Sequence, residues 1–180
     1  MKLNVLVDTS AWMRAHELEQ HDPGHREMNK IIKEASADPS LCLLYSEDVI
    51  RELQGIINDD ERDAKKRQQA RETLSLVELV GNIVHYTGSG FGKATFGLMT
   101  FGKTGWEGNQ PSHDKDKLIL DVVPSGTETI DFVISSNVNH FSKRKNEIEN
   151  HARQTGTPVC VMTPEEFLDW YRHRDQEDTI

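Results

Sequence analysis

Four oxygen-bearing side chains, spread widely along the chain, are of the kind that together hold a hard divalent cation. Asp8 ends an apolar run, and Glu52 lies in an expected helix. Asp116 opens another expected helix, and Asn137 follows an expected strand. A nuclease that acts on phosphodiesters commonly gathers such groups around Mg²⁺ or Mn²⁺, which activates a water and neutralises charge on the phosphate. The set is therefore a candidate metal site.

The first of these groups, Asp8, follows the apolar run at residues 3–7. Such a run predicts a buried strand of a parallel sheet, with Asp8 at the carboxyl end, where open α/β sheets bind ligands. Because an isolated charge among apolar neighbours is costly, we expect Asp8 to meet a cation or a hydrogen-bond donor. Alternatively, Asp8 or Thr9 caps a helix that begins near Ala11. The stretch by itself leaves both interpretations open.

Strands and helices alternate along the chain at the spacing typical of βαβ units. Strands are expected over residues 3–7, 41–45, 83–86, 129–134 and 158–162. Helices are expected over residues 11–19, 25–37, 46–57, 59–80, 113–123 and 143–154, and after a capping box at 163–166. The predicted fold is a three-layer α/β/α domain with a central parallel sheet of about four to five strands.

Length and composition favour one domain that spans residues 1–180. No apolar stretch is long enough for a membrane span, and no signal-peptide pattern opens the chain. Cys42 and Cys160 lie in apolar runs, which predicts buried free thiols and a cytoplasmic location. The net charge of −9 disfavours a protein that simply coats nucleic acid. We expect the last residues, 175–180, to be frayed.

Taken in order, several segments resemble the motifs of the PIN-domain ribonucleases, particularly toxins of the VapC type. The family opens with Asp-Thr-Ser, carries Glu-Leu in a helix and an aspartate entering an apolar helix, and has a Thr-x-Asn-x-x-His-Phe version of its fourth motif. Ser135 stands in the threonine position of that motif. The similar segments here are Val7-Asp8-Thr9-Ser10, Glu52-Leu53, Asp116-Lys117-Leu118-Ile119 and Ile134-Ser135-Ser136-Asn137-Val138-Asn139-His140-Phe141.

This resemblance implies Mg²⁺- or Mn²⁺-dependent cleavage of RNA that leaves a 5′-phosphate. It implies that Asp8, Glu52 and Asp116 hold the metal and that Asn137 completes or orients the ligand shell. Ser10 would then hydrogen-bond a carboxylate or a metal-bound water. The expected partners are an RNA substrate and a small antitoxin protein, with a homodimer as the expected assembly.

A Gly- and aromatic-rich insertion at residues 88–112 has no period that fits a helix or a strand. Its aromatic and lysine side chains are suited to stacking on bases and contacting phosphates, as a flap over the site. A surface loop packed on its own aromatics, or a dimer contact, explains the composition equally well. The candidate RNA-binding residues are Lys93, Phe96, Phe101, Lys103 and Trp106.

A second hypothesis places a non-catalytic RNA- or protein-binding module on the same fold. The acidic net charge, the long aromatic segment and Asn137 in place of an aspartate motivate it. The module would bind without turnover and would tolerate a change of Asp8. Metal binding near neutral pH therefore discriminates between the two hypotheses.

Overall fold

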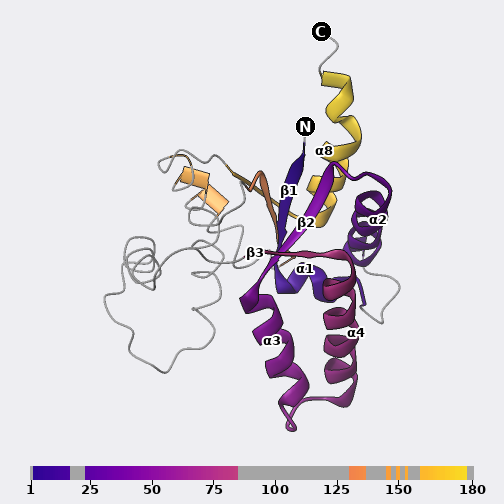
Figure 1. The fold of residues 1–180 in the computed structure, drawn as a ribbon, viewed down its shortest axis with the longest axis vertical. Coiled ribbons are helices and arrows are strands. Elements are labelled where there is room, and N and C mark those ends of the chain that lie inside the picture. The colour runs from indigo at the N-terminus through magenta and orange to yellow at the C-terminus, as the bar shows by residue number, and fades with distance from the viewer. Residues whose placement is uncertain are drawn as a thin grey trace.

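The computed structural model describes residues 2–16, 23–84, 130–136, 145–146, 149–150, 153 and 159–177. Its strands are β1 (Leu3–Val7), β2 (Leu41–Ser46), β3 (Asn82–Val84), β4 (Phe132–Ile134) and β5 (Cys160–Met162). Its helices are α1 (Thr9–Arg14), α2 (Pro23–Ala37), α3 (Glu47–Asn58), α4 (Ala64–Val80) and α8 (Pro164–Glu177). Figure 1 shows their arrangement.

The five strands form one sheet in the order β3-β2-β1-β4-β5, and every neighbouring pair is parallel. β1 lies at the centre, where Val5 pairs with Leu43 of β2 on one side and with Phe132 of β4 on the other. Along the chain, β2 and β3 are added on one side of β1, and β4 and β5 are then added on its other side. The order therefore reverses between β1 and β4, which creates a topological switch point at the carboxyl ends of these strands.

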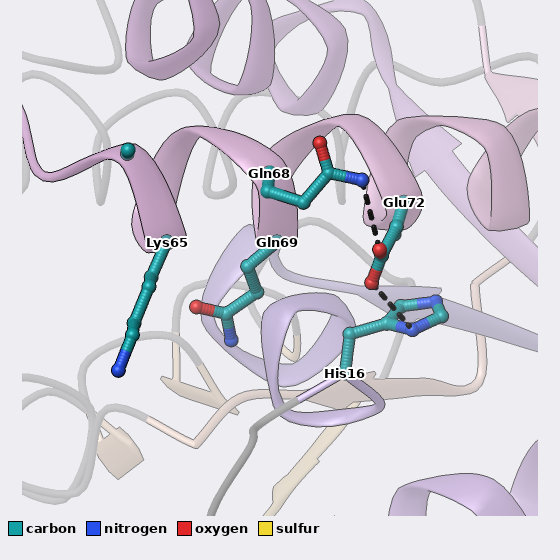
Figure 2. Close-up of a pocket in the computed structure, with 6 residues that line it drawn as sticks. His16, Lys65, Gln68, Gln69 and Glu72 are labelled. Atoms are coloured by element: carbon teal, nitrogen blue, oxygen red, sulfur yellow. Dashed lines mark hydrogen bonds and ion pairs between the residues drawn. The ribbon is translucent and has the colours of Figure 1, made fainter.

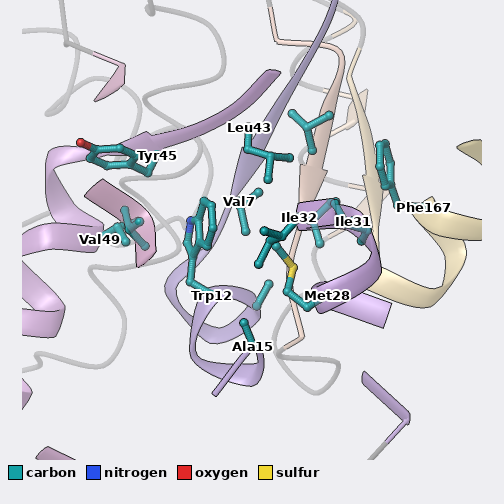
Figure 3. Packing of buried hydrophobic residues seen from close by; sticks show 14 of the residues in the cluster. Val7, Trp12, Ala15, Met28, Ile31, Ile32, Leu43, Tyr45, Val49 and Phe167 are labelled. Atoms are coloured by element: carbon teal, nitrogen blue, oxygen red, sulfur yellow. The ribbon is translucent and has the colours of Figure 1, made fainter. Parts of the chain in front are cut away.

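One face of the sheet packs against helices in a continuous hydrophobic core. Trp12 of α1 and Met28 and Ile31 of α2 are fully buried and gather near Val7 and Leu43 (Figure 3). Full burial of each such side chain is worth roughly 1.5–3 kcal/mol. Aromatic contacts attach α8 to the same face, and they join Phe132 to Phe167 at 5.3 Å and to Trp170 at 4.4 Å between ring centroids.

The opposite face of the sheet is buried as well. Leu6, Leu44 and Val133, which alternate with the residues of the first face, are at most 2% exposed. The helical residues 145–146 and 149–150 lie across the sheet from α2 (Figure 1), and the Glu149 carboxylate accepts a hydrogen bond from the Val161 amide at 3.0 Å. Strands buried on both faces are typical of parallel sheets between helical layers. The predicted three-layer α/β/α, PIN-like fold is thus confirmed.

The predicted start of the helix over residues 59–80 is wrong, because α4 begins only at Ala64. Asp59 instead closes a turn, in which its carboxylate accepts from the Glu61 amide at 3.2 Å. Asp63 is the N-cap and accepts from the Lys65 amide at 2.7 Å. Short acidic side chains bond nearby backbone amides, so they form turns and caps more readily than they extend a helix.

The two cysteines differ in exposure. Cys42 is buried in β2 as predicted, and its sulfur accepts a hydrogen bond from Asn82 at 3.3 Å. Cys160 is exposed, so the prediction of a second buried thiol is wrong. β5 pairs only with β4 in the described sheet, and a strand at this edge buries its residues less completely than a central one.

Several predicted features lie outside the described residues. They include the expected helix at 113–123, most of that at 143–154, the insertion at 88–112 and the last residues of the tail. Among the helices that the structure describes, none combines the length and the apolar character needed to cross a membrane.

Candidate active site

Asp8 lies at the switch point of the sheet, where β1 ends and α1 begins. Its backbone amide donates to the Ile134 carbonyl at 2.9 Å, which holds the end of β1 beside the end of β4. Asp8 is also the N-cap of α1, since its Oδ2 accepts from the Ser10 amide at 3.4 Å. The capping interpretation is therefore confirmed, and it engages only one of the two carboxylate oxygens.

Two serine hydroxyls meet the same carboxylate oxygen. Ser10 Oγ donates to Asp8 Oδ2 at 2.5 Å, and Ser135 Oγ donates to the same atom at 3.0 Å. The two hydroxyl oxygens are 3.1 Å apart, and the Ser136 amide donates to Ser10 Oγ at 3.1 Å. The expected meeting of Asp8 with hydrogen-bond donors is thus observed. The donors come from α1 and from the residues that follow β4.

The other oxygen, Asp8 Oδ1, accepts no hydrogen bond from any residue that the structure describes. The Asp8 side chain is half-buried at the rim of the sheet. A carboxylate oxygen with open lone pairs, on a side chain anchored through its second oxygen, suits a hard divalent cation. Asp8 Oδ1 therefore has the chemistry of one ligand for a hard divalent cation, and a complete site needs further ligands.

Glu52 is carried by α3, which begins at the same rim. Because Leu6 pairs with Leu44, Ser46 at the end of β2 lies level with Asp8. α3 starts directly after Ser46 and is anchored in the core by Val49 and Leu53. Glu52 lies in the second turn of this helix and is half-buried. The fold thus brings the helix of Glu52 to the strand end that carries Asp8.

The remaining predicted site residues lie outside the described part of the chain. These are Asp116, Asn137, Lys93, Phe96, Phe101, Lys103 and Trp106. Within the described residues, no group of three or more His, Cys, Asp or Glu side chains is placed to hold a metal ion. The complete ligand set therefore stays a prediction.

The sequence alone gives Ser135 no role beyond its place in a motif position that holds threonine in the PIN-type motif. In the structure Ser135 is 1% exposed and touches both Asp8 and Ser10. The local signal for such a residue is a hydroxyl directly after a buried strand at the switch point, because strand ends there face the site.

A pocket of about 280 Å³ lies away from this site, between α1 and α4 (Figure 2). His16 Nδ1 lies 3.8 Å from a Glu72 oxygen, and Gln68 donates to the other Glu72 oxygen at 2.9 Å. Ala64, Lys65 and Gln69 complete the lining. Basic and acidic side chains thus lie near each other on the first turns of α4, which is typical of the solvent-facing side of a helix.

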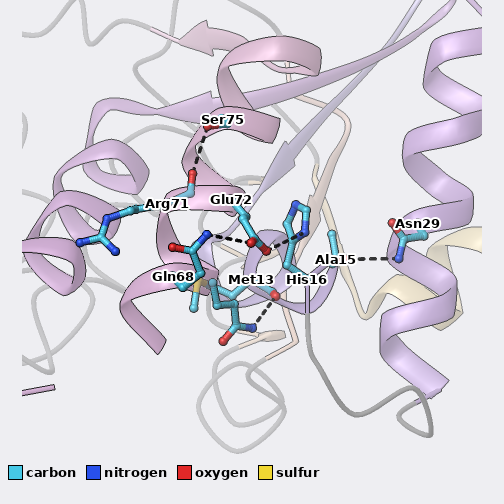
Figure 4. A network of polar contacts seen from close by, with 9 residues as sticks. Met13, Ala15, His16, Asn29, Gln68, Arg71, Glu72 and Ser75 are labelled. Atoms are coloured by element: carbon cyan, nitrogen blue, oxygen red, sulfur yellow. Dashed lines mark hydrogen bonds and ion pairs between the residues drawn. The ribbon is translucent and has the colours of Figure 1, made fainter. Parts of the chain in front are cut away.

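The polar contacts beside this pocket satisfy the end of α1 (Figure 4). Gln69 donates to the Met13 carbonyl at 2.9 Å, and Asn29 donates to the Ala15 carbonyl at 3.2 Å. The last carbonyls of a helix lack partners within the helix, so side chains from neighbouring helices commonly bind them. These contacts hold α1 against α4 and α2, which supports the position of Asp8 at the start of α1.

No protein-family model and no curated protein matches this chain in sequence. Among solved structures, the chain is similar to one described as VapBC2 from Rickettsia felis bound to a DNA fragment from their promoter. The two chains are 13% identical with a TM-score of 0.52, and the match covers 89% of this chain and 98% of the other. At this identity the likeness concerns the fold alone, and it agrees with the α/β/α, PIN-like architecture described above.

Proposed function

We propose that this protein is a Mg²⁺- or Mn²⁺-dependent endoribonuclease. The observation that carries the proposal is the Asp8 carboxylate at the switch point, held by two serines through Oδ2 and open at Oδ1. The similarity in fold to the VapBC2 structure and the ordered PIN-like motifs of the sequence support the same function.

In this proposal Asp8, Glu52 and Asp116 hold the cation, and Asn137 completes or orients the ligand shell. When bound, the cation would supply Lewis-acid chemistry, which activates a water and neutralises charge on the phosphate. Ser10 anchors Asp8, which keeps the carboxylate in one orientation while RNA enters. Lys93, Phe96, Phe101, Lys103 and Trp106 are proposed to contact the RNA.

An RNase assay with Asp8→Asn tests this function. The protein is expected to cleave RNA in the presence of Mn²⁺ or Mg²⁺, and EDTA is expected to abolish cleavage. Asp8→Asn removes the ligand charge and is expected to lower the rate by about 10²-fold or more. Asp60→Asn is the matched control, because Asp60 is 95% exposed, pairs with Arg67 and has no role in the proposed site. Cleavage by Asp8→Asn at the rate of the unchanged protein would contradict the assigned site.

We further propose that the protein is the toxin of a toxin-antitoxin pair, with a small antitoxin protein as its partner. The support is the solved structure that the chain resembles, which is a VapBC2 structure with promoter DNA. A cytoplasmic location and a homodimer stay predictions from the sequence.

A second candidate is a non-catalytic RNA- or protein-binding module on the same fold. The net charge of −9 favours the protein-binding form of this module, because an acidic chain attracts basic proteins and repels phosphate. Calorimetric titration with Mn²⁺ near neutral pH separates the candidates. Binding that is lost in Asp8→Asn supports the nuclease, whereas a chain that binds no Mn²⁺ supports the module.

A further inference from the structure

All three hydrogen bonds that reach the Asp8 carboxylate from described residues end on Oδ2. They come from the Ser10 amide, the Ser10 hydroxyl and the Ser135 hydroxyl. An N-cap needs only the first of these, so capping by itself explains neither hydroxyl. The two hydroxyls fix which oxygen of the carboxylate faces the protein and which faces outward.

The direction of the Ser10 proton follows from the contacts of its oxygen. Ser10 Oγ accepts from the Ser136 amide at 3.1 Å, and its own proton is directed to Asp8 at 2.5 Å. Ser135 Oγ is 3.0 Å from Asp8 Oδ2 and 3.1 Å from Ser10 Oγ. Both hydroxyls thus contact the same carboxylate oxygen, and the network joins the residues after β4 to the carboxylate after β1.

Ser135 differs from Ser10 because it contacts Asp8 from the end of the neighbouring strand, β4. Ser10 belongs to α1 and moves with the helix that Asp8 caps. Ser135 follows β4, is 1% exposed and lies 127 positions further along the chain. Among the described residues that follow β4, Ser135 is thus the one whose side chain bonds the Asp8 carboxylate directly, whereas Ser136 reaches it through Ser10.

We propose that Ser135 is a positioning residue that holds Asp8 by Oδ2 and thereby directs Oδ1 toward the divalent cation. This inference rests on the proposed metal-dependent function of the same site. Ser135 does not touch the cation in this proposal. It raises cation affinity by removing the other orientations of the Asp8 carboxylate, as partners of metal ligands commonly do.

Calorimetric titration with Mn²⁺ alone, without RNA, tests the proposal. Ser135→Ala is expected to weaken Mn²⁺ binding by about tenfold, at the low end of the loss typical for partners of metal ligands. Ser135→Thr keeps the hydroxyl and is expected to restore the affinity. Ser75→Ala is the matched control, since it removes an exposed hydroxyl whose hydrogen bond within the described residues goes to the Arg71 carbonyl of its own helix at 3.1 Å.

A merely structural role for Ser135 gives a different pattern. It would lower the unfolding free energy of the metal-free protein in EDTA and leave the Mn²⁺ affinity unchanged. In the positioning role, the Mn²⁺ concentration for half-maximal cleavage rises in Ser135→Ala, and the rate recovers when Mn²⁺ is saturating. Should Ser135→Ala fail to fold, Ser135→Cys keeps the size and replaces the hydroxyl by a weak donor.

The outcomes separate this inference from the proposed function. Mn²⁺ binding that is lost in Asp8→Asn but is equal in Ser135→Ala and the unchanged protein would overturn the role of Ser135 alone. A protein that binds no Mn²⁺ would overturn both the role of Ser135 and the metal-dependent function. Weaker binding in Ser135→Ala, restored by threonine, supports both.

Discussion

The Asp8 carboxylate combines two tasks, because its two oxygens face different surroundings. Oδ2 accepts from the Ser10 amide and from the hydroxyls of Ser10 and Ser135, while Oδ1 accepts from none of the described residues. A helix cap and a metal ligand are therefore compatible in one residue. From the sequence, Asp8 as a helix cap and Asp8 as a metal ligand are alternatives. In the structure they are not, because each role uses a different carboxylate oxygen.

At Asp8, removal of the charge and removal of the cap are expected to have different effects on stability. Asp8→Asn keeps an oxygen that can cap α1, so its unfolding free energy in EDTA is expected to stay close to that of the unchanged protein. Asp8→Ala removes the cap and leaves two hydroxyls without their acceptor, and it is expected to cost about 1–2 kcal/mol or more. Urea denaturation in EDTA measures both values. Equal stability of Asp8→Ala and the unchanged protein would show that the cap contributes nothing.

At the scale of elements, α8 is attached at the rim of the sheet opposite to the candidate site. Asp38, in the turn between α2 and β2, accepts from the Tyr171 hydroxyl at 2.5 Å, from the Ser40 amide at 2.8 Å and from Arg174 at 3.2 Å. Arg174 also lies over the Tyr171 ring, 3.9 Å from its centroid. The hydrogen bonds from Tyr171, Ser40 and Arg174 hold the pKa of Asp38 well below its usual range. Burial and the Asp38 bond raise the pKa of Tyr171 to about 12.

These pKa shifts predict a pH dependence of stability that Tyr171→Phe should reduce. A lowered pKa at Asp38 stabilises the fold above the unfolded value, so this contribution is lost as the pH falls below about 4. A raised pKa at Tyr171 stabilises the fold below the unfolded value, so this contribution is lost as the pH rises from 10 to about 12. The difference in unfolding free energy between the protein and Tyr171→Phe is therefore expected to be largest between these limits.

Denaturation curves across this pH range, recorded for both proteins, measure that difference. Tyr45→Phe is a suitable control, because Tyr45 lies in β2 and is similarly buried but makes no described contact with Asp38. A difference that stays constant from acid to alkaline pH would contradict the role of the Asp38–Tyr171 bond.

At the helix starts, a local sequence pattern predicts one boundary correctly and another wrongly. The capping box of α8 was predicted from four residues, and in the structure the Thr163 amide donates to Glu166 at 2.8 Å while the Glu166 amide donates to Thr163 at 3.2 Å. The start of α4 was predicted too early, because acidic residues favour both helix starts and turns. The structure assigns Asp59 to the turn and Asp63 to the cap, a division that the run of acidic residues alone does not specify.

For the whole molecule, the proposed toxin role predicts an effect on cells that depends on Asp8. Expression of the unchanged protein is expected to halt growth, because cleavage of cellular RNA stops protein synthesis, and co-expression of a small protein partner is expected to restore it. Growth curves measure both effects. Asp8→Asn should permit normal growth at the same protein level, and Asp60→Asn should arrest growth like the unchanged protein. Equal arrest by Asp8→Asn would separate toxicity from the proposed site.

The sequence by itself determined the alternation of strands and helices, the placement of Asp8 at the end of β1 and the buried character of both sheet faces. These features follow from periodicity, caps and turn residues within a few positions of one another. Only the tertiary structure decided the strand order β3-β2-β1-β4-β5 and the contact of Ser135 with Asp8. That contact joins residues 127 positions apart. Such a contact depends on which strands become neighbours, a choice made by packing of the whole chain rather than by any local pattern.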